Sequence, residues 1–171
     1  RRFDVAEHRT TAGGAERFHS VANGIAALSD ACDLIAVQDG VRPLASAAMI
    51  RGVIETAARY GAAIPIVGAV DSFREIEAGE EAKEDPRSHP VDRSRLRIVQ
   101  TPQVFRSWLL REAYGVEFRS EFTDDASVVE AAGYPVSLAP GERSNIKLTT
   151  PDDFTIAEAL LAAREEVPAD E

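Results

Sequence analysis

Apolar residues along the chain switch repeatedly between a helical and an extended spacing. In residues 21–28 they recur at i, i+4 and i+7, one face of a helix, and residues 33–38 form a short apolar run typical of a buried strand. A second helical face covers residues 49–57, and residues 62–67 form a second apolar run. This alternation predicts an α/β domain whose parallel or mixed sheet is covered by helices on both sides.

The last third of the chain returns to the same alternation. Short helices are expected at residues 108–110 and 124–132, with Thr123 as the N-cap residue of the second. A strand is expected at residues 134–139, and a final helix begins at Thr150-Pro151, because proline suits the first helical position. The expected buried stripe of that helix comprises Phe154, Ala157 and Leu161.

The middle of the chain breaks the pattern. Residues 73–77 and 91–99 alternate imperfectly between apolar and polar side chains, and residues 78–90 between them are rich in charge, proline and glycine. Two extended arms with a solvated connection predict a long hairpin that projects from the body. The alternative is a disordered surface insertion, which is common for long segments without secondary structure.

Length and composition limit the class of protein. The 171 residues fit one domain, which we expect over residues 1–164 with the arm at about 70–95 and a polar tail at 165–171. With 29 acidic and 19 basic residues, the net charge of −10 argues against a general nucleic-acid binder. No apolar run approaches the ~20 residues that cross a bilayer, and the single cysteine excludes a cysteine zinc cluster. A cytoplasmic enzyme or binding domain is therefore expected.

Two polar segments at element boundaries can carry chemistry. Gly13 and Gly14 lie just before a predicted helix. Backbone N–H groups in such a turn can hold an anion, and the side chains of Arg17 and Ser20 add further donors. A plain turn is the alternative there. Asp39 and the residues after it follow the first predicted strand, at the edge where open α/β sheets bind ligands. Asp39 can hold Mg²⁺ or a substrate hydroxyl, or it can simply form a turn with Arg42 as its partner.

Three further residues suit the recognition of phosphate. Arg93 and Thr101 offer a guanidinium group and a hydroxyl group to phosphate oxygens. Lys147 is one of two lysines in a chain with seventeen arginines, and its ammonium is a compact point charge. Each of these residues can also be explained as a solvated surface group.

Together these segments resemble a known family. The motifs, in chain order, are Gly13-Gly14-x-x-Arg17-x-x-Ser20-Val21, Asp39-Gly40-Val41-Arg42-Pro43, Val91-Asp92-Arg93, Thr101-Pro102-Gln103-x-Phe105, Thr123-Asp124-Asp125-Ala126-Ser127, Asn145-Ile146-Lys147 and Pro151-Asp152-Asp153. Their order resembles that of the 2-C-methyl-D-erythritol 4-phosphate cytidylyltransferases of the non-mevalonate isoprenoid pathway. The resemblance covers roughly residues 8–163.

The resemblance implies a fold and an activity. It implies a Rossmann-like nucleotidyltransferase fold with a mostly parallel sheet flanked by helices, and a homodimer whose hairpin arms interlock. The substrates would be CTP and a polyol phosphate, 2-C-methyl-D-erythritol 4-phosphate, with Mg²⁺ as the cofactor. The products would be the cytidine diphosphate derivative and pyrophosphate.

The resemblance also implies roles for individual residues. The expected CTP contacts are Gly14, Ala15, Arg17, Ser20, Asp39 and Gly40. The expected contacts to the polyol phosphate are Arg42, Ser72, Arg93, Thr101, Thr123 and Lys147. The expected catalytic residues are Lys147, Arg93 and Asp39, and Asp39 is also the expected metal ligand. Arg93 and Thr101 would act from the partner subunit, whereas Thr123 and Lys147 would act from the same subunit.

The chain departs from the family at its start. The family opens with a strand and a Gly-rich loop whose basic residues bind the triphosphate, and nothing of this kind precedes Gly13. We therefore expect an N-terminally incomplete domain that, expressed alone, does not turn over CTP at a useful rate. Two alternatives to the full assignment remain: a cytidylyltransferase for ribitol 5-phosphate or another polyol phosphate, and a non-catalytic dimerisation domain.

Overall fold

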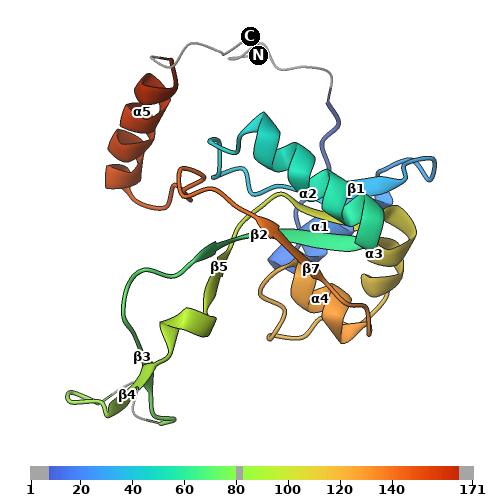
Figure 1. Ribbon diagram of the computed structural model, residues 1–171. Helices are drawn as coiled ribbons and strands as arrows, with labels where there is room; N and C mark the ends of the chain where they lie inside the picture. Colours follow the sequence, from blue (N-terminus) through green and yellow to red (C-terminus); the bar gives the residue numbers. More distant parts are fainter. Residues whose placement is uncertain (1–7, 80–82, 166–171) are drawn as a thin grey trace.

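The computed structural model describes residues 8–79 and 83–165 (Figure 1). The helices are α1 (Arg17–Ala26), α2 (Ala47–Tyr60), α3 (Ser107–Ala113), α4 (Asp125–Ala131) and α5 (Pro151–Glu165), with a 3-10 turn at Arg93–Arg95. The strands are β1 (Leu34–Val37), β2 (Ala62–Gly68), β3 (Phe73–Ile76), β4 (Ser88–Val91), β5 (Arg97–Val99), β6 (Gln103–Arg106) and β7 (Ser137–Pro140). No described helix has both the length and the apolar character of a membrane span.

The central sheet has five strands and mixed directions. β6 lies between β1 and β2 and is antiparallel to both, β5 extends the same antiparallel pairing along β2, and β7 is parallel to β2. β1, β2 and β7 therefore share one direction. The α/β class with flanking helices is confirmed, but the sheet is mixed rather than mostly parallel. Local periodicity predicted β1 and β2 correctly, but it cannot show that a later strand inserts between them.

Helices cover both faces of this sheet because neighbouring strand residues point to opposite sides. On β2, Ala63 packs beneath α2 in one buried cluster, while Ala62 and Ile64 belong to the larger cluster on the other face. On β6, Val104 and Phe105 divide in the same way. The larger cluster is filled by residues of α1, α3 and α4. Both apolar runs are strands, as predicted. β2 is buried on both faces, whereas in β1 only Ile35 is buried and Ala36 is exposed.

A bulge separates β5 from β6 where both meet β2. Ile66 of β2 lies opposite Val99 of β5, and Ala63 of β2 lies opposite Val104 of β6. Between these two pairs, the segment that joins β5 to β6 contains more residues than β2 does. The surplus of two residues lies within residues 100–102, where the peptide bond between Thr101 and Pro102 is cis. Bulges commonly redirect side chains beside functional sites. Here the bulge lies at the end of the sheet where β1 stops.

The arm forms, but its second strand differs from the predicted one. β3 pairs with β4 in an antiparallel hairpin that projects from the body (Figure 1). The prediction of a strand over residues 91–99 is wrong, because the strand ends at Val91 and Asp92 caps the 3-10 turn. Residues 97–99 then belong to the central sheet as β5. In the described residues the arm is therefore a hairpin, as predicted, and not an unstructured insertion.

Two further expectations about helices are wrong. The N-cap residue of α4 is Asp124 rather than Thr123, because Asp124 accepts a hydrogen bond from Ser127 N and completes a capping box. On α5, only Ala157 of the expected stripe is buried, while Phe154 is 59% exposed and Leu161 48%. α5 stands away from the sheet (Figure 1), so most of the expected stripe is left exposed. The predicted tail lies outside the described residues from 166 onward.

Candidate active site

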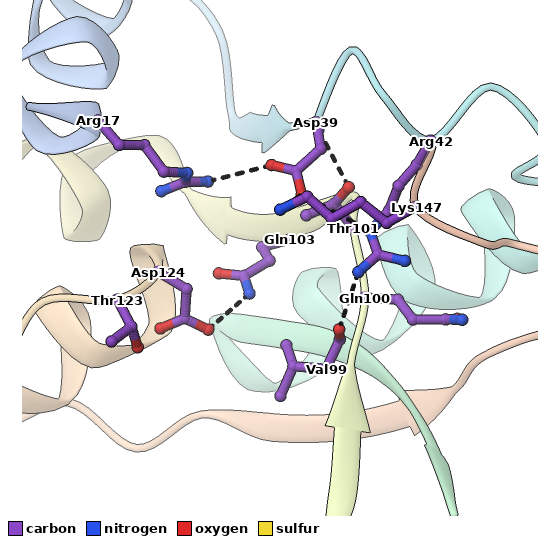
Figure 2. A pocket seen from close by; sticks show the side chains of 10 residues that line it. All are labelled: Arg17, Asp39, Arg42, Val99, Gln100, Thr101, Gln103, Thr123, Asp124 and Lys147. Atoms are coloured by element: carbon purple, nitrogen blue, oxygen red, sulfur yellow. Dashed lines mark hydrogen bonds and ion pairs between the residues drawn. The ribbon is translucent and has the colours of Figure 1, made fainter. Parts of the chain in front are cut away.

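A cavity of about 280 Å³ opens at the carboxyl ends of β1 and β7, beside the bulge. Figure 2 shows the side chains that converge on it from five separate segments of the chain. The lining residues are Arg17, Asp39, Arg42, Val99, Gln100, Thr101, Gln103, Thr123, Asp124 and Lys147. The structure thus brings together six of the residues selected from the sequence: Arg17, Asp39, Arg42, Thr101, Thr123 and Lys147.

Three cations surround the carboxylate of Asp39. Lys147 Nζ lies 3.4 Å and Arg42 Nε 3.6 Å from Asp39 Oδ2. Arg17 Nη2 lies 3.7 Å from Asp39 Oδ1. The Asp39 side chain is only 17% exposed, whereas that of Lys147 is 49% exposed. The cavity is therefore locally cationic within an acidic chain, which suits an anionic ligand.

Arg17 is held by a buried carboxylate on the side away from Asp39. Its two terminal nitrogens donate to Asp125 at 3.1 and 2.7 Å, and Asp125 is fully buried. Tyr114 also donates its hydroxyl hydrogen to Asp125. Burial lowers the pKa of Arg17, but hydrogen bonding and the charge of Asp125 outweigh that effect and raise it above the ordinary value. Burial, together with Asp125, raises the pKa of Tyr114 well above its usual range.

The bulge connects the charged residues to the sheet. Asp39 N donates to Thr101 Oγ1 at 3.0 Å, and Asn145 Nδ2 donates to the Thr101 carbonyl at 3.0 Å. Gln103 donates to Asp124 Oδ2 at 2.8 Å, which links the sheet to the start of α4. Thr101 therefore lies in the cavity of its own chain, and its expected action from a partner subunit stays a prediction.

The glycine loop before α1 lies beside the cavity without lining it. Gly14 N donates to Ser20 Oγ at 2.9 Å, so these two expected CTP contacts bind each other. A methyl group at Gly14 would come within 2.2 Å of the His19 Cβ, which explains why glycine is required there. Ala15 is exposed in the same loop. At Gly40, by contrast, an added Cβ would meet no atom within 4 Å, which leaves room for a ligand.

The expected arm residues do not join this group. Ser72 is exposed at the base of the hairpin. Arg93 is also exposed, and its guanidinium donates to the carbonyl of Val70 in the same chain. Within one chain, then, the structure does not bring Ser72 and Arg93 into the cavity.

No metal cluster is formed by the described residues, since no three His, Cys, Asp or Glu side chains gather in an arrangement suited to a metal ion. Asp39 is the expected ligand, and its oxygens accept no hydrogen bond from described side chains. The oxygens of Asp124, the other carboxylate of the cavity, are used by Gln103 and Ser127. Of these two carboxylates, Asp39 is therefore the better candidate for a metal ligand, although its present partners are three cations.

Several residues that hold the site together were not selected as site residues from the sequence. Asp125, Gln103 and Asn145 stood in the motifs that carried the family resemblance, but nothing local marked them as buried. Gln100 lies directly beside a motif and is also buried. Tyr114 carried no signal, because its contact with Asp125 forms only when α3 packs against α4.

Comparison with known proteins identifies the family. A sequence model of the family described as "IspD: 2-C-methyl-D-erythritol 4-phosphate cytidylyltransferase" matches residues 5–163. The chain belongs to this family. A 2-C-methyl-D-erythritol 4-phosphate cytidylyltransferase of Bacteroides thetaiotaomicron is 50% identical over 155 residues, which cover 91% of this chain and 67% of that protein. The resemblance stated from the sequence motifs is confirmed.

Solved structures of the family have the same fold. The crystal structure of the cytidylyltransferase from Thermus thermophilus superposes with a TM-score of 0.74 at 40% identity, covering 88% of this chain and 71% of that one. A bifunctional enzyme IspD/IspF of Anaeromyxobacter dehalogenans is 46% identical over 158 residues, which cover 91% of this chain and 40% of that protein. The chain spans about two thirds of the length of the cytidylyltransferase of Bacteroides thetaiotaomicron. The Rossmann-like nucleotidyltransferase fold is thus shared across the family.

Proposed function

We propose that the cavity around Asp39 is the active site of a 2-C-methyl-D-erythritol 4-phosphate cytidylyltransferase. The observation that carries the proposal is the convergence of Arg17, Arg42 and Lys147 within 3.7 Å of one carboxylate. A chain of net charge −10 would otherwise repel two anionic substrates. A local group of three cations gives both phosphates a favourable place to meet.

The reaction is a direct displacement at phosphorus. A phosphate oxygen of 2-C-methyl-D-erythritol 4-phosphate attacks the α-phosphorus of CTP in line, and the bond to the bridging oxygen of pyrophosphate breaks. The attacking oxygen is already ionised, so the step needs no general base. Catalysis then depends on positioning and on cations at the equatorial oxygens, where charge develops.

The positions of the cavity residues suggest how they divide this work. Lys147 is the half-exposed cation, so its ammonium can reach both the attacking phosphate and the α-phosphate. Arg42 is only 11% exposed, and its Nε is buried without a hydrogen-bond partner among the described residues. Arg42 therefore contributes its positive charge to the cavity, with its Nε facing Asp39. The hydroxyls of Thr101 and Thr123 line the same cavity and can bind the polyol phosphate.

CTP would occupy the side of the cavity nearest α1. Gly14, Ala15 and Ser20 belong to the loop that leads into this helix and to its first turn, and Gly40 leaves open space beside Asp39. To bind CTP through its backbone N–H, Gly14 would exchange its present hydrogen bond with Ser20 for one with the nucleotide. This exchange costs little, because the hydrogen bond is exposed to water.

We also propose that the arm completes the site of a second subunit in a homodimer. Arg93 and Ser72 are exposed on the arm and lie outside the cavity of their own chain. From this position the guanidinium of Arg93 and the hydroxyl of Ser72 can contact a phosphate bound to another molecule. Contact with a twofold-related copy would bring them to the partner's substrate.

Mg²⁺ is the expected cofactor, and the donors present fit it. Mg²⁺ is commonly held by one or two carboxylates together with substrate phosphates, and Asp39 provides one carboxylate. When bound, the ion would neutralise phosphate charge on CTP. Activity of the full-length protein should then disappear on addition of a chelator and return with excess Mg²⁺.

The test of the proposed function is product analysis with the full-length protein. With CTP and 2-C-methyl-D-erythritol 4-phosphate, we expect pyrophosphate release and the cytidine diphosphate derivative. Ribitol 5-phosphate under the same conditions should be a much poorer substrate. A preference for ribitol 5-phosphate would move the protein to the other polyol-phosphate enzymes. A dimer without turnover of either substrate would indicate a non-catalytic dimerisation domain.

A further inference from the structure

Lys147 lies on a loop that has no regular secondary structure of its own. β7 ends at Pro140 and α5 begins at Pro151, so residues 141–150 depend on tertiary contacts for their position. The Lys147 side chain makes one ion pair, with Asp39 at 3.4 Å, and is half exposed. That contact is too weak to hold the loop, since exposed ion pairs contribute little. Other contacts must therefore position the lysine.

The side-chain amide of Gln100 binds the backbone of this loop. Its Nε2 donates to the carbonyls of Glu142 at 2.7 Å and Asn145 at 3.2 Å, and its Oε1 accepts from Glu142 N at 3.1 Å. Gln100 is only 4% exposed, so these bonds are shielded from water. The amide pairs with the loop backbone much as a neighbouring strand would. A side chain at Gly141 would displace it, because a Cβ there would lie 2.5 Å from Gln100 Oε1.

The loop is tied to the cavity at two further points. The Asn145 carbonyl that accepts from Gln100 also accepts from Arg42 Nη1 at 2.9 Å, while the Asn145 amide donates to the Thr101 carbonyl. Beyond Lys147, Leu148 N donates to the Val41 carbonyl at 2.8 Å. The bulge and the segment after β1 thus form one surface against which the Lys147 loop is fixed.

We infer that Gln100 is a positioning residue, whose buried amide fixes the loop so that Lys147 faces Asp39. Gln100 is not expected to bind substrate, because both of its N–H groups already donate to loop carbonyls. Its effect on the reaction must then pass through the loop. The effect on rate rests on the proposed function, whereas the effect on the loop does not.

The first test measures the loop directly by hydrogen exchange in Gln100→Met. Methionine keeps the length of the side chain and removes both donors and the acceptor. The amide of Glu142 should exchange about fivefold faster or more, because it loses its buried partner. Gln103→Met is the matched control, since Gln103 Oε1 accepts from Ala126 N and its loss should loosen α4 instead. Unchanged exchange at residues 141–148 in Gln100→Met would overturn the inference whatever the reaction is.

The second test is a double-mutant cycle with Lys147→Ala in the full-length protein. In the wild-type background Gln100→Met should lower kcat/KM by about 10²-fold, the typical result of a small displacement of a catalytic group. In the Lys147→Ala background it should cost less than about threefold, because the group it positions is gone. Equal effects in both backgrounds would mean that Gln100 acts on general stability or on substrate, and would refute the inference.

The cycle also needs proof of folding. Exchange over β2 should stay unchanged in Gln100→Met, since that strand reports the whole sheet. If Gln100→Met does not fold, Gln100→Asn keeps the amide and shortens its reach, and the same loosening and the same lack of additivity are expected. If the wild type does not form product, the proposed function fails, while the exchange result still decides whether Gln100 holds the loop.

Discussion

The cavity and the arm contain residues of similar chemistry in opposite surroundings. Around the cavity, Asp125 and Asn145 are fully buried, and the cations are linked to Asp39 and to backbone carbonyls. On the arm, Phe73 and Ile76 are 40% and 45% exposed. A two-stranded hairpin of this size is barely stable alone in water. The comparison shows that one chain suffices to organise the cavity, whereas the arm is stabilised by little within its own chain.

The arginines of the two regions differ in how firmly their side chains are held. Arg17 is held by both oxygens of a buried carboxylate, so its position is fixed in the free protein. Arg93 donates to a single backbone carbonyl of an exposed turn. A cation held in this way can leave its partner at small cost. An arm that serves a neighbouring active site requires this freedom.

The largest expected effect tests whether the arm serves a second subunit. Arg93→Ala and Lys147→Ala, each made in the full-length protein, should give nearly inactive homodimers, because each removes a cation from every site. When the two variants are unfolded together and refolded, random pairing makes half the dimers mixed. Each mixed dimer has one site with both residues intact, so activity should return to about a quarter of the wild-type value.

The mixture needs evidence of subunit exchange, which native mass spectrometry supplies when one variant carries a mass tag. If exchange is complete and activity stays at the level of the parents, Arg93 acts on its own chain or not at all. The arm would then be a surface hairpin that does not take part in the reaction of a second subunit.

A smaller but still large effect is expected for Asp39→Asn. Without the carboxylate, the three cations repel one another and lose their common partner. We expect kcat/KM of the full-length protein to fall by at least about 30-fold, from steady-state kinetics with both substrates. Cys32→Ser is the control, since Cys32 lies before β1 at the other end of the strand. Equal damage from both variants would show that the cavity is not the site.

An intermediate effect is expected for Asp125→Asn. The amide keeps the shape of the side chain but removes the buried charge that holds Arg17, so the guanidinium should lose its fixed position beside Asp39. We expect a loss of about 2 kcal/mol in the free energy of unfolding, as for a hydrogen bond to a charged group. The drop in kcat/KM should be smaller than for Asp39→Asn. A variant with full activity would show that Arg17 does not need its buried partner.

The smallest effect is expected for Tyr114→Phe, which removes only one hydroxyl donor to Asp125. Urea denaturation should show a loss of about 1 kcal/mol near neutral pH. The pKa of the Tyr114 phenol is raised above its ordinary value of 10.0 by burial and by Asp125. The stabilising effect is therefore full below pH 10 and is lost as the pH rises beyond it. A difference between the two proteins that grows at alkaline pH would contradict this assignment.

The sequence by itself determined the α/β class and the family. Apolar runs that end at turn residues predicted β1 and β2, and the helical spacing before Gly61 predicted α2, which ends there with φ at 97°. These features depend on neighbours within a few residues. The motifs also selected Asp39, Arg42 and Lys147, because charged residues beside strand ends are visible without a structure.

Only the tertiary structure decided how these elements are combined. Arg17 and Asp125 are 108 positions apart, and their hydrogen bonds exist because α1 and α4 begin at the same edge of the sheet. The insertion of β6 between β1 and β2 likewise depends on strand pairing across the whole chain. The burial of Gln100 follows from a register shift that no local pattern records. Phe154 and Leu161 show the converse, since an apolar stripe predicts a buried face only where another element packs against it.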